Sequence, residues 1–284
     1  MERAKPLIYK SYIALTKPGI IFGNLVTMTA GFGLSKDFSL LLFALTALGL
    51  SLVIASACVW NNIIDRHHDG KMERTKDRPL VTKALTVPQA ALFGLILLLL
   101  GIWMLAVYTN VLATTIALIG WFIYVIPYSF LKYRTVHATL IGSIAGAVPP
   151  LVGTCAVQNK IDLAGLIFFV LIVVWQMPHF FAIALYRLED YRNAEVPILP
   201  IKRGLMATKV QMVCYIALFW ILSCTLTLFS IKGLVYLALA GSIGLCWLIL
   251  ALLGFKAHND RLWARKMFLF SLIAVMAISG AVFL

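Results

Sequence analysis

Long apolar stretches separated by short polar segments make up most of this sequence. Stretches without Asp, Glu, Lys or Arg cover 18–35, 38–64, 84–131, 135–159, 163–186, 210–231, 233–255 and 267–284. Because a helix of about 20 residues crosses a bilayer, each stretch accommodates at least one membrane span. The stretch 84–131 accommodates two spans, with an interruption at Tyr108-Thr109-Asn110. The pattern therefore predicts nine membrane-spanning helices.

Composition supports an all-α integral membrane protein. The chain is 62% hydrophobic and 12% charged, with a mean hydropathy of +0.96, whereas soluble domains are roughly 45–50% apolar and about 25% charged. The formal net charge of +13 does not indicate nucleic-acid binding. The basic residues lie in loops next to the membrane, where anionic lipid and membrane topology account for them.

The distribution of basic residues predicts the orientation of the chain in the membrane. If nine helices alternate in direction, 21 of the 24 Lys and Arg residues fall on the side of the N-terminus, and Lys36, Lys160 and Lys232 fall on the other. Cytoplasmic loops carry the excess of Lys and Arg. The N-terminus is therefore predicted to be cytoplasmic and the C-terminus to lie on the opposite, outer side.

Two long cytoplasmic loops, 61–87 and 186–209, follow the second and sixth predicted helices. This spacing predicts two four-helix halves plus a ninth helix around a central cavity. We expect residues 1–284 to form one domain, in which these two loops cap an active site on the cytoplasmic side. A transporter is the alternative from another functional class, but alternating access needs both faces and the outer loops are short.

The first long loop begins with a pattern of polar residues that carries chemistry. Asn61, Asp65 and Asp69 are spaced by four, which stacks their side chains on one face of a helix. The repulsion between the two carboxylates is relieved by a bound cation, and oxygen ligands of this kind suit Mg²⁺. The basic residues Lys71, Arg74, Lys76 and Arg78 follow directly. This arrangement favours a metal–diphosphate site over the alternative of a solvated helix end.

The second long loop also mixes acids and arginines beside a membrane helix. Residues Glu189, Asp190 and Glu195 lie close in sequence to Arg187 and Arg192. This cluster is a candidate for a second metal site facing the first. Local ion pairs on a solvated loop are an equally good interpretation of the sequence.

Prolines and one histidine interrupt the apolar character of two predicted spans. Pro149-Pro150 and Pro178 are expected to bend their helices, because proline removes a backbone hydrogen bond. His179 lies about two turns into the membrane from Arg187, and ionisable groups at that depth are functional candidates. A packed, hydrogen-bonded histidine is the alternative.

Several motifs together are similar to those of one enzyme superfamily. They are Asn61-x-x-x-Asp65-x-x-x-Asp69 with its basic tail, Trp175-Gln176-Met177-Pro178-His179-Phe180, Tyr186-Arg187-x-x-Asp190-Tyr191 and Pro197-x-Leu199-Pro200. The chain resembles the UbiA-type intramembrane prenyltransferase superfamily, and within it the branch that modifies haem. One departure concerns the second motif, which is typically Asp-x-x-x-Asp in the superfamily. Here Tyr186 stands four residues before Asp190, and Ala194 stands four after it.

The resemblance implies an Mg²⁺-dependent transfer of a farnesyl group from farnesyl diphosphate to a vinyl group of haem B. Water is added in the same reaction, which gives haem O for terminal oxidase assembly. The implied location is the bacterial inner membrane, with the C-terminus periplasmic and with haem-handling or oxidase-assembly proteins as partners. A prenyltransferase acting on a quinone precursor or on chlorophyll is the alternative within the superfamily.

The resemblance also assigns roles to individual residues. Asp65, Asp69 and Asp190 are the implied catalytic residues, and the same three with Asn61 are the implied metal ligands. The implied diphosphate ligands are Lys71, Arg74, Arg78, Tyr186 and Arg187. The implied haem-binding residues are His179 and Trp175.

Overall fold

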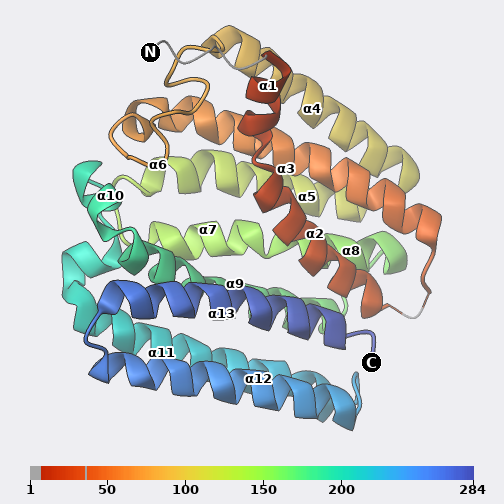
Figure 1. Cartoon of the computed structure of the whole chain (residues 1–284). Coiled ribbons are helices and arrows are strands. Elements are labelled where there is room, and N and C mark those ends of the chain that lie inside the picture. Colours follow the sequence, from red (N-terminus) through yellow and green to blue (C-terminus); the bar gives the residue numbers. More distant parts are fainter. Residues whose placement is uncertain (1–7, 36) are drawn as a thin grey trace.

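A computed structural model of the chain describes residues 8–35 and 37–284, and within these residues every regular element is helical (Figure 1). Arg3, Lys5 and Lys36, which the topology prediction counts, lie outside the described residues. The helices are α1 (Ile8–Thr16), α2 (Pro18–Gly33), α3 (Leu40–Asp69), α4 (Val87–Tyr108), α5 (Val111–Ile123), the π-helical turn η1 (Tyr124–Tyr128), α6 (Ser129–Leu131), α7 (Ala138–Gly146), α8 (Val148–Gln158), α9 (Leu163–Tyr186), α10 (Leu188–Asn193), α11 (Leu199–Leu228), α12 (Leu234–Leu253), the 3₁₀ turn η2 (Gly254–Lys256) and α13 (Asp260–Ala281).

Eight helical segments of the described chain are long and apolar enough to cross a membrane. The first predicted span is instead built from two shorter helices, α1 and α2, which meet at a bend of 40° and bring the count to nine if they cross as one span. Lys17 lies at this bend with a left-handed φ of 52°. Because Pro18 disfavours the right-handed helical conformation in the residue before it, the helix breaks there.

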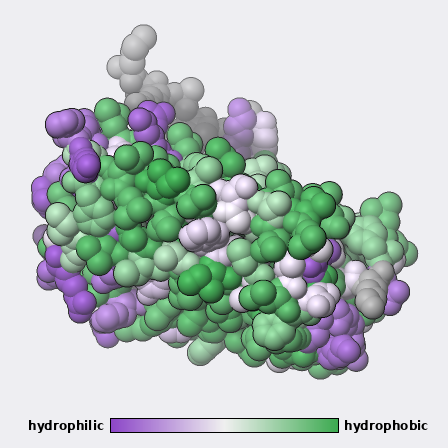
Figure 2. Space-filling view, turned by 90° about the horizontal axis from the view of Figure 1, so that it is seen from below, coloured by the Kyte–Doolittle hydropathy of each residue, from purple (hydrophilic) through white to green (hydrophobic). Residues whose placement is uncertain are grey.

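The outer surface of the bundle is apolar, as lipid contact requires. Leu228 and Leu234 are each 77% exposed, and hydrophobic residues cover most of the face shown in Figure 2, with hydrophilic residues gathered toward its two ends. A soluble protein rarely exposes apolar patches of this extent. The chain is therefore a multi-pass membrane protein.

The interior contains two main apolar cores. One is built mainly from α2, α3, α5 and α8, and the other from α9, α11, α12 and α13. These cores do not follow the predicted two four-helix halves plus a ninth helix. Helix α8, part of the fifth predicted span, packs in the first core, and α13, the ninth predicted span, packs in the second. Helices α2 and α13 also contact each other, which links the two groups.

Breaks and close approaches of helices shape the interior. The helix around Pro149-Pro150 breaks at Ala147, as expected, whereas α9 runs without interruption through Pro178. A second break was not predicted: Gly204 within α11 adopts a φ of 83°. At Gly31, an added Cβ would lie 2.1 Å from the carbonyl oxygen of Pro150. Glycine therefore allows α2 and α8 to pack with their backbones in contact.

Candidate active site

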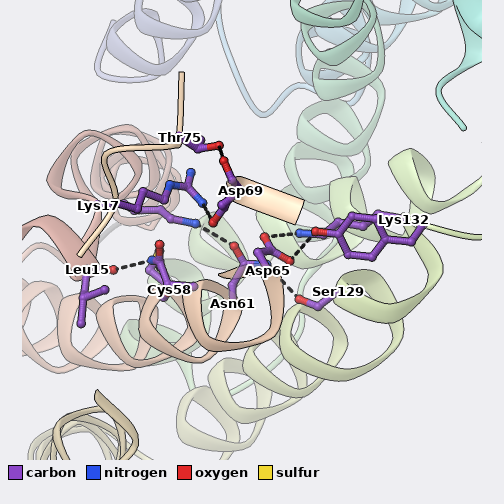
Figure 3. Close-up of polar contacts among 12 residues, drawn as sticks. Leu15, Lys17, Cys58, Asn61, Asp65, Asp69, Thr75, Ser129 and Lys132 are labelled. Carbon is purple, nitrogen blue, oxygen red and sulfur yellow. Dashed lines mark hydrogen bonds and ion pairs between the residues drawn. The ribbon is translucent and has the colours of Figure 1, made fainter. Parts of the chain in front are cut away.

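The C-terminal end of α3 carries the predicted polar residues on one buried face. Asn61, Asp65 and Asp69 are 2%, 4% and 5% exposed, and we refer to them as the α3 triad. Figure 3 shows that their side chains lie among polar groups from other parts of the chain. Buried carboxylates need charged or hydrogen-bonding partners, and each member of the triad has one.

Three cations from three different segments contact the triad. Lys17 Nζ at the bend between α1 and α2 lies 2.7 Å from Asn61 Oδ1. Lys132, which follows α6, forms an ion pair with Asp65, and Arg78 Nη1 lies 2.6 Å from Asp69 Oδ2. The repulsion expected between the two carboxylates is thus offset by protein cations at distances typical of charge-assisted hydrogen bonds.

The π-helical turn at Tyr124–Tyr128 positions the side of the site opposite α3. Ser129 Oγ donates a hydrogen bond to the Tyr124 carbonyl at 2.9 Å and accepts one from Asn61 Nδ2 at 3.0 Å. The Tyr133 hydroxyl donates to Asp65 Oδ1 at 2.8 Å. Turns of this kind often occur at functional sites. Here the turn precedes the chain segment that contacts Asp65.

Burial and charge determine the protonation of the groups around Asp65. Burial lowers the pKa of Lys132, and the neighbouring Asp65 carboxylate opposes this shift. Burial raises the pKa of Tyr133, and Asp65 raises it further. Tyr133 is therefore a neutral phenol that donates a hydrogen bond to the carboxylate.

The two predicted cap loops contact each other above this site. Met72 from the first loop forms a small apolar core with Ala194 and Val196 from the second. Burial raises the pKa of Tyr191, while the guanidinium groups of Arg74, Arg78 and Arg187 lower it. Three arginines from the two loops therefore act on the same tyrosine. A pocket beside them is lined by Tyr128, Lys132, Phe180 and Tyr191, among others.

The donor set of the triad fits a hard divalent cation. It offers two carboxylates and one amide oxygen, the ligand type that Mg²⁺ prefers. Within residues 8–35 and 37–284, no three His, Cys, Asp or Glu side chains gather as a metal-binding cluster. The structure therefore does not bring Asp190 of α10 together with Asp65 and Asp69.

The predicted diphosphate ligands occupy different surroundings. Arg78 contacts Asp69, whereas Lys71 and Arg74 are exposed on the first loop. Tyr186 and Arg187 lie at the C-terminal end of α9, where the Arg187 guanidinium stacks on the Tyr186 ring.

The predicted haem-binding residues lie at the interface of α9 and α13. Trp175 Nε1 donates to the Ser271 carbonyl at 2.8 Å, and its ring stacks on His179. His179 Nδ1 lies 2.7 Å from Ser271 Oγ, which donates its own proton to the Phe268 carbonyl. Because a hydroxyl has one proton to donate, His179 Nδ1 is the donor in this contact. Nε2 then carries the lone pair, and it is not among the buried atoms that lack a partner.

Lys17, Lys132 and Tyr133 are site residues that the sequence did not identify. Both lysines were counted only as topology signals, and Tyr133 was not singled out. The available signal was the position of the lysines beside proline-containing helix breaks, at Pro18 and after Pro127.

Comparisons with known proteins show the family of this chain. A family model described as the UbiA prenyltransferase family matches residues 24–273. A protein of Protochlamydia amoebophila named protoheme IX farnesyltransferase is 50% identical, covering 94% of this chain and 95% of that protein. A protein of the same name from Pseudomonas putida is 47% identical, covering 95% and 92%.

Solved structures show the same fold at much lower identity. A UbiA homolog from Aeropyrum pernix K1 superposes with a TM-score of 0.77 at 15% identity, covering 93% of this chain and 96% of that one. A UbiA homolog from Archaeoglobus fulgidus bound to GPP and Mg²⁺ gives a TM-score of 0.72 at 18% identity, covering 96% and 99%. Because the family model and the curated relatives both match most of its length, this chain belongs to the UbiA prenyltransferase family.

Proposed function

We propose that this protein transfers a farnesyl group from farnesyl diphosphate to a vinyl group of haem B and adds water, giving haem O. The observation that carries the reaction type is the buried α3 triad, with a cation in contact with each member. The choice of haem as acceptor rests on the relatives named protoheme IX farnesyltransferase, which are 47% to 50% identical.

The α3 triad is the proposed binding site for Mg²⁺. Its three oxygen-bearing side chains supply the ligands, and Asp190 is proposed to approach them from α10 when substrate is bound. Bound Mg²⁺ would neutralise negative charge on the diphosphate as it departs.

The cations around the triad are the proposed diphosphate ligands. A metal held by Asp65 and Asp69 would replace Lys132 and Arg78 as their partners, and these two cations would then be available to phosphate oxygens at the same place. Lys17 approaches the same site from the bend between α1 and α2. Lys71 and Arg74 on the first loop complete the proposed set. Stabilising the charge that develops on a leaving group is the main means by which such sites accelerate reactions.

The proposed reaction needs only farnesyl diphosphate, haem B and one water molecule as reactants. The allylic C–O bond of farnesyl diphosphate breaks, and the electron pair leaves with diphosphate. The terminal vinyl carbon bonds to the farnesyl carbon, and water adds to the resulting cation with loss of a proton. The stacked rings of Tyr124 and Tyr128 are proposed to stabilise the allylic cation through their π faces.

His179 is the proposed contact for haem, with Trp175 as its support. The exposed lone pair on His179 Nε2 suits axial ligation of iron. Trp175 stacks on the imidazole and hydrogen-bonds to α13, which restricts the orientation of His179.

The proposed topology follows the charge distribution. Helices α1 and α2 form the first of nine spans around a central cavity, the N-terminus is cytoplasmic and the C-terminus periplasmic. The loops 61–87 and 186–209 cap the site on the cytoplasmic face of a bacterial inner membrane. Haem-handling or oxidase-assembly proteins are the proposed partners.

A comparison of two acceptors, each supplied separately, tests the proposed function. Purified protein is supplied with Mg²⁺, radiolabelled farnesyl diphosphate, and either haem B or 4-hydroxybenzoate, a quinone precursor. We expect label to enter the porphyrin and not the benzoate. Label in the benzoate alone would assign the protein to the quinone branch, and label in neither would reject both assignments.

A further inference from the structure

Two arginines share one aromatic ring at the cytoplasmic ends of α9 and α13. The guanidinium carbon of Arg187 lies 4.7 Å from the centroid of the Tyr186 ring. That of Arg261, at the start of α13, lies 5.6 Å from the same centroid. The ring therefore has two positive charges beside it, and a bound anion would offset their mutual repulsion.

The nearby acids do not supply that anion. Asp260, the neighbour of Arg261, forms an ion pair with Lys209 at 2.5 Å. Glu189, two residues after Arg187, pairs with Arg192 at 2.8 Å. In the described part of the chain, neither Arg187 nor Arg261 has a carboxylate within ion-pair distance. The pair is therefore a cationic site without a protein anion.

This pair lies on α9 and α13, helices of the second apolar core, whereas the α3 triad lies on a helix of the first. Helix α13 packs against α9, α12 and α2, and Figure 1 shows α7 between α3 and α13. Both sites are at the cytoplasmic ends of their helices. The triad already has Lys17, Arg78 and Lys132 beside it, so this pair is a second cationic site, available to a different anion.

The chemistry of haem B supplies such an anion in a fitting position. Its two propionates lie on one edge of the porphyrin, and the vinyl group that becomes farnesylated lies toward the opposite edge. A haem whose propionates contact α9 and α13 therefore directs its vinyl edge across the bundle, toward α3. His179 lies seven residues before Tyr186, two helical turns and about 10 Å deeper along α9, beneath a ligand held in this way.

We propose that Arg187 and Arg261, stacked on Tyr186, bind the propionates of the haem substrate and orient its vinyl edge toward the α3 triad. This inference rests on the proposed function and assigns Arg187 to haem in place of diphosphate. Guanidinium groups bind carboxylates in a planar, bidentate manner, and the ring of Tyr186 keeps both groups at the site.

Esterified haem tests the proposal, because haem B dimethyl ester retains the iron and vinyl groups but lacks the carboxylates. Michaelis constants for haem B and for its dimethyl ester are measured with wild type, Arg187→Gln, Arg261→Gln and the matched control Arg265→Gln. Arg265 is an exposed arginine on the same helix. We expect wild type and the control to prefer haem B by about tenfold, the size of a lost charge-assisted contact. Arg187→Gln and Arg261→Gln should lose that preference while their Michaelis constants for farnesyl diphosphate stay unchanged.

The other outcomes overturn the proposal in distinguishable ways. Equal losses of activity with haem B and with the ester would indicate a structural role or a lipid phosphate at the site. A rise in the Michaelis constant for farnesyl diphosphate alone would return Arg187 to the diphosphate. If wild type farnesylates haem B and both variants still prefer haem B to its dimethyl ester, this inference is rejected and the proposed function is left intact. No turnover of haem B by wild type would reject the proposed function itself.

Discussion

Lys132 and Asp65 form a buried ion pair that joins the segment after α6 to the C-terminal end of α3. Their side chains are 16% and 6% exposed. A pair of this kind ties together the two segments that build the site, and its loss has separate consequences for stability and for chemistry.

Replacing Asp65 separates these two consequences. Asp65→Ala leaves Lys132 as an unpaired buried charge, and breaking a buried pair costs about 3–5 kcal/mol of folding free energy. The double variant Asp65→Asn/Lys132→Met removes both charges and should recover most of the melting temperature measured in detergent. We expect neither Asp65 variant to farnesylate haem, and we expect the same loss of activity in Asp69→Ala. Substantial activity in a folded Asp65 or Asp69 variant would remove the α3 triad from the mechanism.

Lys17 offers a second test of the cations around the triad. Lys17→Met should raise the Michaelis constant for farnesyl diphosphate about tenfold or more, because a charge-assisted hydrogen bond contributes about 1.5–3 kcal/mol. Lys10→Met removes an exposed lysine from the same region and should leave that constant unchanged. An equal response of the two variants would show that Lys17 acts only through general surface charge.

The contact between α2 and α8 predicts a large difference between two glycines of one helix. In Gly31→Ala the new methyl group would meet the Pro150 carbonyl, whereas a Cβ at Gly23 has no atom within 4 Å. Overpacking costs about 1–3 kcal/mol, so Gly31→Ala should lower the melting temperature by several degrees. Gly23→Ala should be neutral or slightly stabilising, because alanine favours helix formation over glycine by about 1 kcal/mol. Similar melting temperatures for the two variants would contradict the close packing.

Ser271 should influence haem through His179. In Ser271→Ala, His179 Nδ1 loses its acceptor, so the tautomer with a free Nε2 is no longer favoured. We expect the absorption spectrum of bound haem B to shift in Ser271→Ala and to return toward wild type in Ser271→Thr. His179→Ala should show the same loss, with recovery on addition of imidazole. A spectrum that is the same in wild type and His179→Ala would exclude axial ligation by this histidine.

The sequence was sufficient to predict the helical spans but not their internal breaks. Charge-free stretches of about 20 residues give an unambiguous signal of spans, and eight described segments agree with them. The bend at Lys17 and the break at Gly204 depend on backbone conformations with positive φ. Single glycines and residues before prolines also occur in regular helices, so such conformations were not evident from the sequence.

The site was predictable only where its residues share one helix. The spacing of four between Asn61, Asp65 and Asp69 is a local signal, because side chains at this spacing share a helix face. Their partners Lys17 and Lys132 are 44 and 67 positions away in the chain. Such contacts are set by the packing of whole helices, which the sequence pattern does not specify. The same holds for the contact between Tyr186 and Arg261.

The mass of the haem product tests the central claim most directly. Purified wild type and the Asp65→Asn/Lys132→Met variant are incubated with haem B and farnesyl diphosphate, with Mg²⁺ or with EDTA, and the extracted haem is analysed by mass spectrometry. The account predicts a farnesylated and hydrated haem from wild type with Mg²⁺ and unchanged haem B from the other three incubations. The same product from the folded variant, or unchanged haem B from wild type with Mg²⁺, would contradict it.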